Sequence, residues 1–233
     1  MGIIVQKFGG TSVADTDKIK NVAKAVLKEK ANGNDVVVVV SAMGHTTDGL
    51  VKLSKEITVL PNSREMDVLL STGELISMSL LALALNETGN PAISLTGAQA
   101  GIKTESCHTH ARILDIDTTR VKKHLKEGKI VVVAGFQGID ETGDITTLGR
   151  GGSDTTAVAL ACALNAKRCD IYSDVEGVYT ADPRVIKTAQ KLKEISYDEM
   201  LELARVGANV LHPRSVETAK LNNMKMRVRS SFK

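Results

Sequence analysis

Aromatic residues are scarce in this chain of 233 residues, making up 3% of it, and tryptophan is absent. Basic residues outnumber acidic ones so slightly that the formal net charge is only +3. Proteins that bind nucleic acid usually show a basic stripe, and those that bind single strands add aromatic rings on which bases stack. The composition therefore argues against a nucleic-acid partner.

Cysteine and proline are also rare, with three and four copies. Cys107, Cys162 and Cys169 are odd in number and lack metal-ligand spacing, so we expect reduced thiols and neither a disulfide framework nor a zinc site. The chain contains no internal repeat and no Pro-rich linker. These absences favour a single domain with two lobes.

Long apolar runs are missing from the sequence. No run approaches the roughly 20 residues that a membrane-spanning helix needs. Lys7 and the glycines after it interrupt the apolar start of the chain, so a signal peptide is not expected. We therefore expect a cytoplasmic protein with no membrane partner.

Short apolar, β-branched runs are present and alternate with helical patterns. Because the runs are continuous, with no polar residue at every second position, they favour strands buried on both faces, as in a parallel sheet. The apolar runs cover 3–5, 36–40, 92–95, 130–133 and 171–172, and the helical patterns cover 16–30, 64–88, about 118–127, 153–165, 196–206 and 214–222. This alternation predicts an α/β fold, a three-layer sandwich with a mostly parallel central sheet and helices on both faces. The alternating segment 226–232 is typical of an edge strand.

Four of the predicted strands are followed by small, polar or glycine residues. These strand ends are 7–12, 41–48, 135–138 and 173–177. In open parallel sheets, ligands bind where strands end at their carboxyl edge. Any one such loop is ordinary, but four together favour a phosphate-rich ligand lying across that edge.

The segment LGRGGSDTT at 148–156 carries the strongest single signal, because it opens an apolar helix. Its glycines let backbone N–H groups approach an anion, and the helix N-terminus favours negative charge. Arg150 offers a planar fork for a carboxylate or phosphate. Asp154 in the first turn is by itself an ordinary helix-start residue, but beside Arg150 and three glycines it favours a functional site.

Missing motifs disfavour a P-loop mechanism and a dinucleotide-binding fold, and they argue against a protein kinase. The sequence has no G-x-x-x-x-G-K-[ST] loop, and no G-x-G-x-x-G follows its first strand. The D-F-G and H-R-D signatures of protein kinases are absent too.

Seven segments nevertheless resemble, in the same order, the catalytic domain of aspartate kinases, in the amino-acid kinase superfamily. They are KFGGTS at 7–12, the segment 41–48, STGE at 71–74, GFQG at 135–138, GRGGSDTTA at 149–157, SDVEGVYTADPR at 173–184 and VLHPRSVE at 210–217. The resemblance covers essentially the whole chain. It implies one catalytic domain, with an amino-acid-binding lobe at about 1–150 and a nucleotide-binding lobe at about 151–233.

The resemblance implies that MgATP phosphorylates the side-chain carboxylate of L-aspartate to give 4-phospho-L-aspartate, the first step towards lysine, threonine and methionine. It gives Lys7 and Asp154 the catalytic roles, with Asp154 organising Lys7. The implied ATP site is Lys7, Gly9, Gly10, Ser41, Ser173, Asp174, Tyr179, Asp182, Arg184 and Asn209. The implied aspartate site is Thr47, Glu74, Arg150, Gly151, Gly152 and Ser153. No protein metal site is implied, because Mg²⁺ can be carried by the ATP phosphates.

Two departures from the family pattern stand out. Asn209 occupies a position where many members have a lysine near the nucleotide phosphates, and the paired ACT regulatory domains that usually follow are not expected within 1–233. A homodimer, or association with a regulatory region, is expected.

Other interpretations remain open from the residues alone. The fold also hosts kinases of acetylglutamate, glutamate, carbamate and nucleoside monophosphates, and a nucleotide-binding subunit without turnover is a further alternative. Glu74 in a long helix could be a solvated surface charge, and Lys7 beside a strand could be an ordinary surface lysine.

Overall fold

The computed structural model describes residues 2–183, 185–207 and 210–232, so Arg184 and Asn209 lie outside the described residues. A six-stranded sheet forms its centre, in the order β10-β9-β1-β2-β6-β3, and every neighbouring pair is parallel. The strands are β1 (Ile3–Phe8), β2 (Asp35–Val40), β3 (Ala92–Leu95), β6 (Ile130–Ala134), β9 (Arg168–Ser173) and β10 (Met226–Ser230). The predicted edge strand near 226–232 is therefore confirmed as β10.

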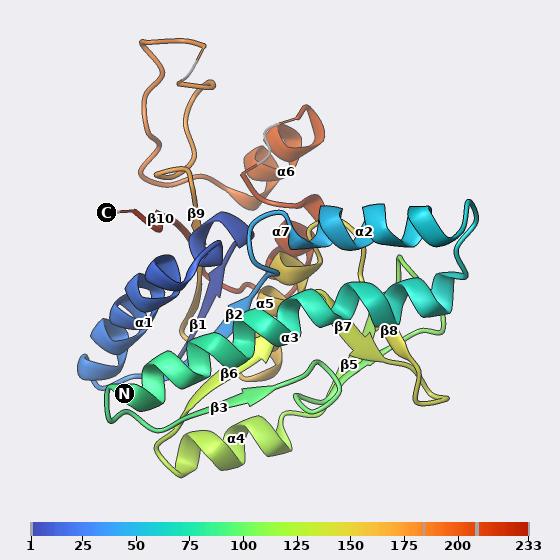
Figure 1. The fold of residues 1–233 in the computed structure, drawn as a ribbon. Coiled ribbons are helices and arrows are strands. Elements are labelled where there is room, and N and C mark those ends of the chain that lie inside the picture. The colour runs from blue at the N-terminus through green and yellow to red at the C-terminus, as the bar shows by residue number, and fades with distance from the viewer. Residues whose placement is uncertain (1, 184, 208–209, 233) are drawn as a thin grey trace.

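Helices cover both faces of this sheet (Figure 1). One face carries α1 (Thr16–Ala31) and α3 (Ser63–Glu87), and the other carries α4 (Thr119–Lys126), α5 (Gly152–Ala163), α6 (Tyr197–Arg205) and α7 (Pro213–Leu221). The valines of β2 divide between the two cores: Val36, Val38 and Val40 pack with α1 and α3, whereas Val37 and Val39 pack with α5. All five valines are fully buried, which confirms the three-layer α/β prediction.

Local capping signals place the helix ends close to where the sequence predicted them. Asp15 caps α1, its carboxylate accepting a hydrogen bond of 2.8 Å from the Lys18 backbone N–H. Asp117 accepts from the Thr119 backbone N–H at 3.0 Å at the start of α4. Gly33 follows α1 with a φ of +78°, a conformation that glycine adopts without strain.

The structure contains elements that the sequence patterns did not predict. A second, four-stranded sheet has the order β5-β4-β7-β8, from β4 (Ile102–Thr104), β5 (Ile113–Ile116), β7 (Gln137–Ile139) and β8 (Ile145–Thr147). A short 3₁₀ helix, η1 (Gly10–Val13), follows β1. The segment after β2 forms α2 (Thr46–Ile57), on which Ser54 is the buried residue and Leu53 and Ile57 are exposed. Strands of three or four residues give too little periodicity to detect, whereas α2 does carry apolar residues at helical spacing, Leu50, Leu53 and Ile57.

Helix α3 corrects one expectation, because its 25 residues are long and apolar enough by length and composition to cross a membrane. Its buried face packs against α1 and the central sheet. That face also carries two buried carboxyl groups, Asp67 and Glu74. These features are those of a core helix.

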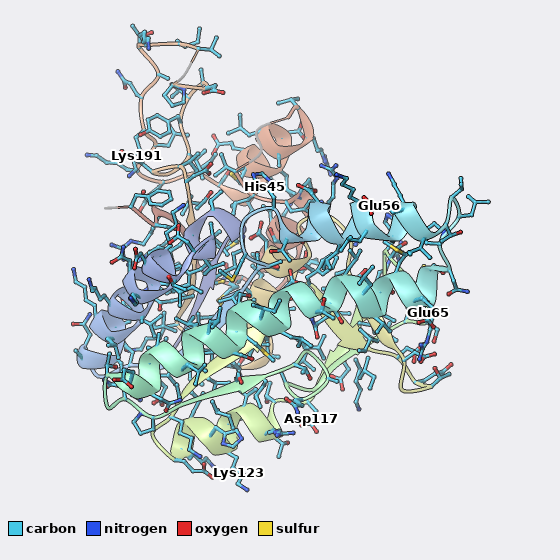
Figure 2. All side chains as sticks on the ribbon, in the orientation of Figure 1. His45, Glu56, Glu65, Asp117, Lys123 and Lys191 are labelled. Carbon is cyan, nitrogen blue, oxygen red and sulfur yellow. The ribbon has the colours of Figure 1, made fainter. Side chains whose placement is uncertain are left out.

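The parallel arrangement brings the carboxyl ends of β1, β2, β6 and β9 to one edge of the sheet. This confirms that the polar strand ends seen in the sequence face a common region. The residues after β9 project away from the rest of the molecule in Figure 1, and Lys191 marks this segment in Figure 2.

Candidate active site

Lys7 and Asp154 form an ion pair at this edge. Lys7, in β1, shares a sheet face with Val5, which packs against the α5 layer. Asp154 lies in the first turn of α5, and the Lys7 Nζ is 2.7 Å from its Oδ1. The side chains are only 12% and 13% exposed. Lys7 is therefore not a free surface lysine, and Asp154 does more than begin a helix.

Glu74 enters the same edge from α3, on the opposite face of the sheet. The residue is 3% exposed, and its Oε1 accepts a hydrogen bond of 2.9 Å from the Ala42 backbone N–H, just after β2. Its Oε2 is buried and has no hydrogen-bond partner among the described residues. Burial raises the pKa of Glu74 to about 7, although the Ala42 N–H opposes the shift. The idea that Glu74 is a solvated surface charge is therefore wrong.

The STGE segment at 71–74 fastens α3 to the sheet edge. A Cβ added at Gly73 would lie 2.8 Å from the Ala42 Cβ, so glycine is needed for this close approach. Ser77, one turn later, donates a hydrogen bond of 2.7 Å to the Ser41 carbonyl. Gln137 donates one of 3.0 Å to the Ser71 carbonyl. Together these contacts hold Glu74 in place.

The glycine-rich turn before α5 has a left-handed backbone. Gly149 and Gly151 have φ values of +74° and +68°. A Cβ added at Gly151 would lie 2.2 Å from the Cγ of His212. Arg150, between these glycines, is exposed at the surface of the turn, where its guanidinium is accessible to an anionic ligand.

Gly151→Ala is expected to disrupt this turn. The left-handed backbone costs a residue with a Cβ about 1–2 kcal/mol, and the collision with the His212 ring adds to that cost. We expect a lower unfolding midpoint in denaturant and a raised KM for the substrate that the family resemblance assigns to Arg150. Gly143→Ala is the matched control, because Gly143 also has a positive φ (+88°) but nothing lies within 4 Å of its added Cβ. Equal effects of the two substitutions would rule out a special role for the His212 contact.

The remaining residues of the implied substrate site lie on neighbouring elements. Ser153 is buried in the first turn of α5, and a Cβ on Gly135, at the end of β6, would lie 2.8 Å from the Ser153 Oγ. Thr47 is half-buried in the first turn of α2, next to the end marked by His45 in Figure 2. Gly152 is the first residue of α5 and is buried against Phe136.

Gly9 and Gly10 follow β1 at this edge, where neighbouring groups leave little room for a side chain. A Cβ on Gly9 would lie 3.4 Å from the Lys7 Nζ, and one on Gly10 would lie 2.9 Å from the Ala42 carbonyl oxygen. Gly10 and Gly44 are linked by a backbone hydrogen bond of 3.0 Å. The two glycines thus lie between the Lys7 ion pair and the backbone group that binds Glu74.

The other residues of the implied nucleotide site are spread over two regions. Ser41 directly follows β2, and Ser173 ends β9, where its hydroxyl donates to the Asp174 carboxylate at 3.0 Å. Tyr179 and Asp182 lie on the projecting segment after β9. For Ser41, Ser173, Asp174, Tyr179 and Asp182 the nucleotide role stays a prediction.

His212 lies at this site and was not singled out from the sequence. It is the N-cap residue of α7, and its Nδ1 is buried without a hydrogen-bond partner in the described part of the chain. Burial, and next the Arg214 charge, lower the pKa of His212. Arg214 donates a hydrogen bond of 3.1 Å to the Leu148 carbonyl. Five histidines without a pattern gave no signal, because the contact with Gly151 joins residues distant in sequence.

Protein metal ligands were not expected, and no group of three or more His, Cys, Asp or Glu residues within 2–183, 185–207 and 210–232 could hold a metal ion. Cys107, Cys162 and Cys169 are free cysteines in the structure.

Comparison with known proteins defines the class of this fold and site. The model of the amino acid kinase family matches residues 2–230, so the chain belongs to that family. The chain is 66% identical over 232 residues to an aspartokinase of Geobacillus stearothermophilus, covering 100% of this chain and 57% of that protein.

Two solved structures extend this comparison. The crystal structure of aspartate kinase from Synechocystis superposes with a TM-score of 0.88 at 53% identity, covering 99% of this chain and 38% of that one. The structure of E. coli aspartokinase III in complex with aspartate and ADP gives a TM-score of 0.89 at 32% identity, covering 98% and 62%. The chain thus spans a little over half the length of the curated relative that it matches.

Proposed function

We propose that this chain is the catalytic part of an aspartate kinase that transfers a phosphoryl group from ATP to the side-chain carboxylate of L-aspartate, giving 4-phospho-L-aspartate. The observation that carries the proposal is the meeting of a partly buried lysine–aspartate pair and a buried glutamate at one sheet edge. The Ala42 backbone links them, because its N–H binds Glu74 while its carbonyl faces Gly10, close to Lys7. The relatives named as aspartokinases support the same substrate.

The reaction needs little acid–base chemistry from the protein. The aspartate side chain is already ionised at neutral pH, so it attacks the γ-phosphorus directly and ADP leaves. Phosphoryl transfer depends mainly on positioning and on stabilising charge on the transferring group. Lys7 supplies that positive charge, and Asp154 holds the Lys7 Nζ at 2.7 Å in the required direction.

The α-ammonium and α-carboxylate groups of aspartate are complementary in charge to Glu74 and Arg150. Glu74 has an unpaired oxygen in a buried position, which fits the α-ammonium. Arg150 is exposed on the glycine-rich turn, where its planar fork fits the α-carboxylate. Ser153 and Thr47 add hydroxyl groups at the starts of α5 and α2.

The residues after β1 fit the phosphates of ATP. Side chains are absent at Gly9 and Gly10, where a Cβ would crowd Lys7 and Ala42, so the backbone can approach an anion closely. Mg²⁺, when bound with ATP, neutralises phosphate charge and keeps part of its own water shell. The described residues therefore fit a metal brought by the nucleotide.

An acyl phosphate reacts with hydroxylamine, which gives a direct test. The chain is incubated with MgATP and a panel of aspartate, glutamate, N-acetylglutamate and UMP, and hydroxamate and ADP are measured. We expect hydroxamate with aspartate alone. ADP formation with UMP, or hydroxamate with glutamate, would favour another kinase of the same fold. Nucleotide binding without ADP formation on any acceptor would favour the non-catalytic alternative.

Arg150→Ala should separate substrate binding from chemistry. The Arg150 fork would contact a group remote from the reacting carboxylate. We therefore expect the KM for aspartate to rise by roughly 10- to 100-fold, because one or two charge-assisted hydrogen bonds are lost. The KM for ATP should change little. Arg205→Ala on α6 is the control, since Arg205 is an exposed arginine paired with Glu202. A drop in kcat without a change in KM would contradict the proposed role.

A further inference from the structure

We propose that Asp67 is a positioning residue that sets the place of the Arg150 turn relative to Glu74, an inference that rests on the proposed function. Asp67 lies on α3, and its side chain is fully buried. Its printed hydrogen-bond partners are His108, Thr109 and Thr147, not Lys7 or Asp154, and no sequence motif singled it out. Its contacts all lead to segments next to the glycine-rich turn.

The Asp67 carboxylate accepts hydrogen bonds from three residues. The Thr147 hydroxyl donates to Oδ1 at 2.5 Å, and the Thr109 backbone N–H donates to both oxygens at 3.1 and 3.0 Å. The Nδ1 of His108 lies 2.9 Å from Oδ2. A buried carboxylate with this many donors fixes its neighbours firmly, because each donor would otherwise lose its partner away from water.

The loop held by Asp67 packs directly on the turn that carries Arg150. Thr109 has a positive φ of +71°, and its carbonyl oxygen would lie 3.1 Å from a Cβ on Gly149. The Ala111 N–H donates to the Thr147 carbonyl at 2.9 Å, which ties the loop to the end of β8. Thr147 itself is two residues before Gly149. Asp67 therefore holds both the strand that leads into the turn and the loop beneath it.

Helix geometry connects this anchor to Glu74. Asp67 and Glu74 are seven residues apart, which is close to two full turns, so they lie on the same face of α3 about 10 Å apart along its axis. α3 is a continuous helix from Ser63 to Glu87. The helix therefore fixes the distance between two residues of the aspartate site. Glu74 would bind the ammonium, and Asp67, through the loop and the turn, would locate the Arg150 guanidinium.

Asp67→Asn tests this role with almost no change in shape. It removes the negative charge and turns one acceptor into a donor that faces the Thr109 N–H or the Thr147 hydroxyl. We expect the KM for aspartate to rise roughly tenfold through misplacement of a binding group, while the KM for ATP stays within about twofold of wild type. Thr147→Val, which removes only one donor, should give a smaller rise in the same direction.

Asp170→Asn is the matched control. Asp170 is also a fully buried carboxylate, held by Arg168 Nε at 3.0 Å on β9. Its replacement should lower the unfolding midpoint without changing the KM for aspartate. If Asp67→Asn lowers stability as Asp170→Asn does and leaves that KM unchanged, Asp67 is merely structural and the inference is wrong.

Hydrogen exchange gives a second readout that does not depend on activity. In Asp67→Asn we expect faster amide exchange in 107–111 and 148–152, with β2 unchanged; in Asp170→Asn these two segments should exchange as in wild type. If the wild-type chain makes no hydroxamate, the proposed function fails, while the exchange data still decide whether Asp67 positions the turn. Unchanged exchange in both segments would overturn the inference.

Discussion

Lys7→Ala is expected to lower kcat by roughly 10²- to 10³-fold, the usual effect of removing one group that stabilises transition-state charge. Lys7 is 12% exposed and held 2.7 Å from Asp154, so no other cation can simply take its place through solvent. The KM for aspartate should change little, because the substrate's α-groups are assigned to Glu74 and Arg150. Steady-state kinetics with hydroxamate detection measures both constants.

The Lys7 experiment needs a check on folding, because Lys7→Ala leaves Asp154 as a partly buried charge without its partner. The double variant Lys7→Ala/Asp154→Asn removes that charge and should recover stability but not kcat. Lys30→Ala is the control substitution, since Lys30 is another partly buried lysine and lies away from the site. Its Nζ is 3.3 Å from the Asp35 Oδ1. Full kcat with weakened ATP binding in Lys7→Ala would assign Lys7 to the nucleotide alone.

The architecture was predictable wherever the physical signal is local. The continuous valine run of β2 could be stable only between two apolar layers, and both layers are present. The ends of α1 also depend on local features, the Asp15 cap and the left-handed Gly33. The second sheet escaped prediction because its strands are three or four residues long, and their partners are set by tertiary contacts.

The candidate site likewise has parts that the sequence could predict and parts that it could not. The polar end of the first strand contains Lys7, and the glycine-rich start of a helix identified Arg150 and Asp154 as candidates. The structure pairs Lys7 with Asp154. Nothing in the sequence could show that His212 packs on Gly151, or that Asp67 holds Thr109, because these contacts join residues 61 and 42 positions apart. Their roles depend on where the turn, the loop and the helices meet in the folded chain.

Glu74→Gln is expected to raise the KM for aspartate by roughly 100-fold, since hydrogen bonds to charged groups contribute about 1.5–3 kcal/mol and the ionic attraction to the ammonium is lost as well. Glutamine keeps the shape of the side chain and can still accept from the Ala42 N–H. Glu65→Gln, in the exposed first turn of α3 and labelled in Figure 2, is the control and should leave that KM unchanged.

The raised pKa of Glu74, about 7, predicts how wild type responds to pH. Aspartate binding requires the ionised carboxylate, so kcat/KM for aspartate should fall about tenfold for each pH unit below 7. This decline should be absent in Glu74→Gln. The effect of pH on stability has the opposite sign. Because the pKa of Glu74 in the folded chain lies above the ordinary 4.5, the free energy of unfolding falls as pH rises from about 4.5 to 7.

The two effects together give Glu74 a signature that an ordinary structural glutamate lacks. At pH 8, Glu74→Gln should be more stable to denaturant than wild type, by up to about 3 kcal/mol for a shift of this size, while binding aspartate far more weakly. Near pH 4 the stability difference should vanish, since both side chains are then neutral. Denaturant unfolding at the two pH values, beside the kinetics, measures this. A variant that loses stability and keeps its KM would show that the buried carboxylate serves the fold and not the substrate.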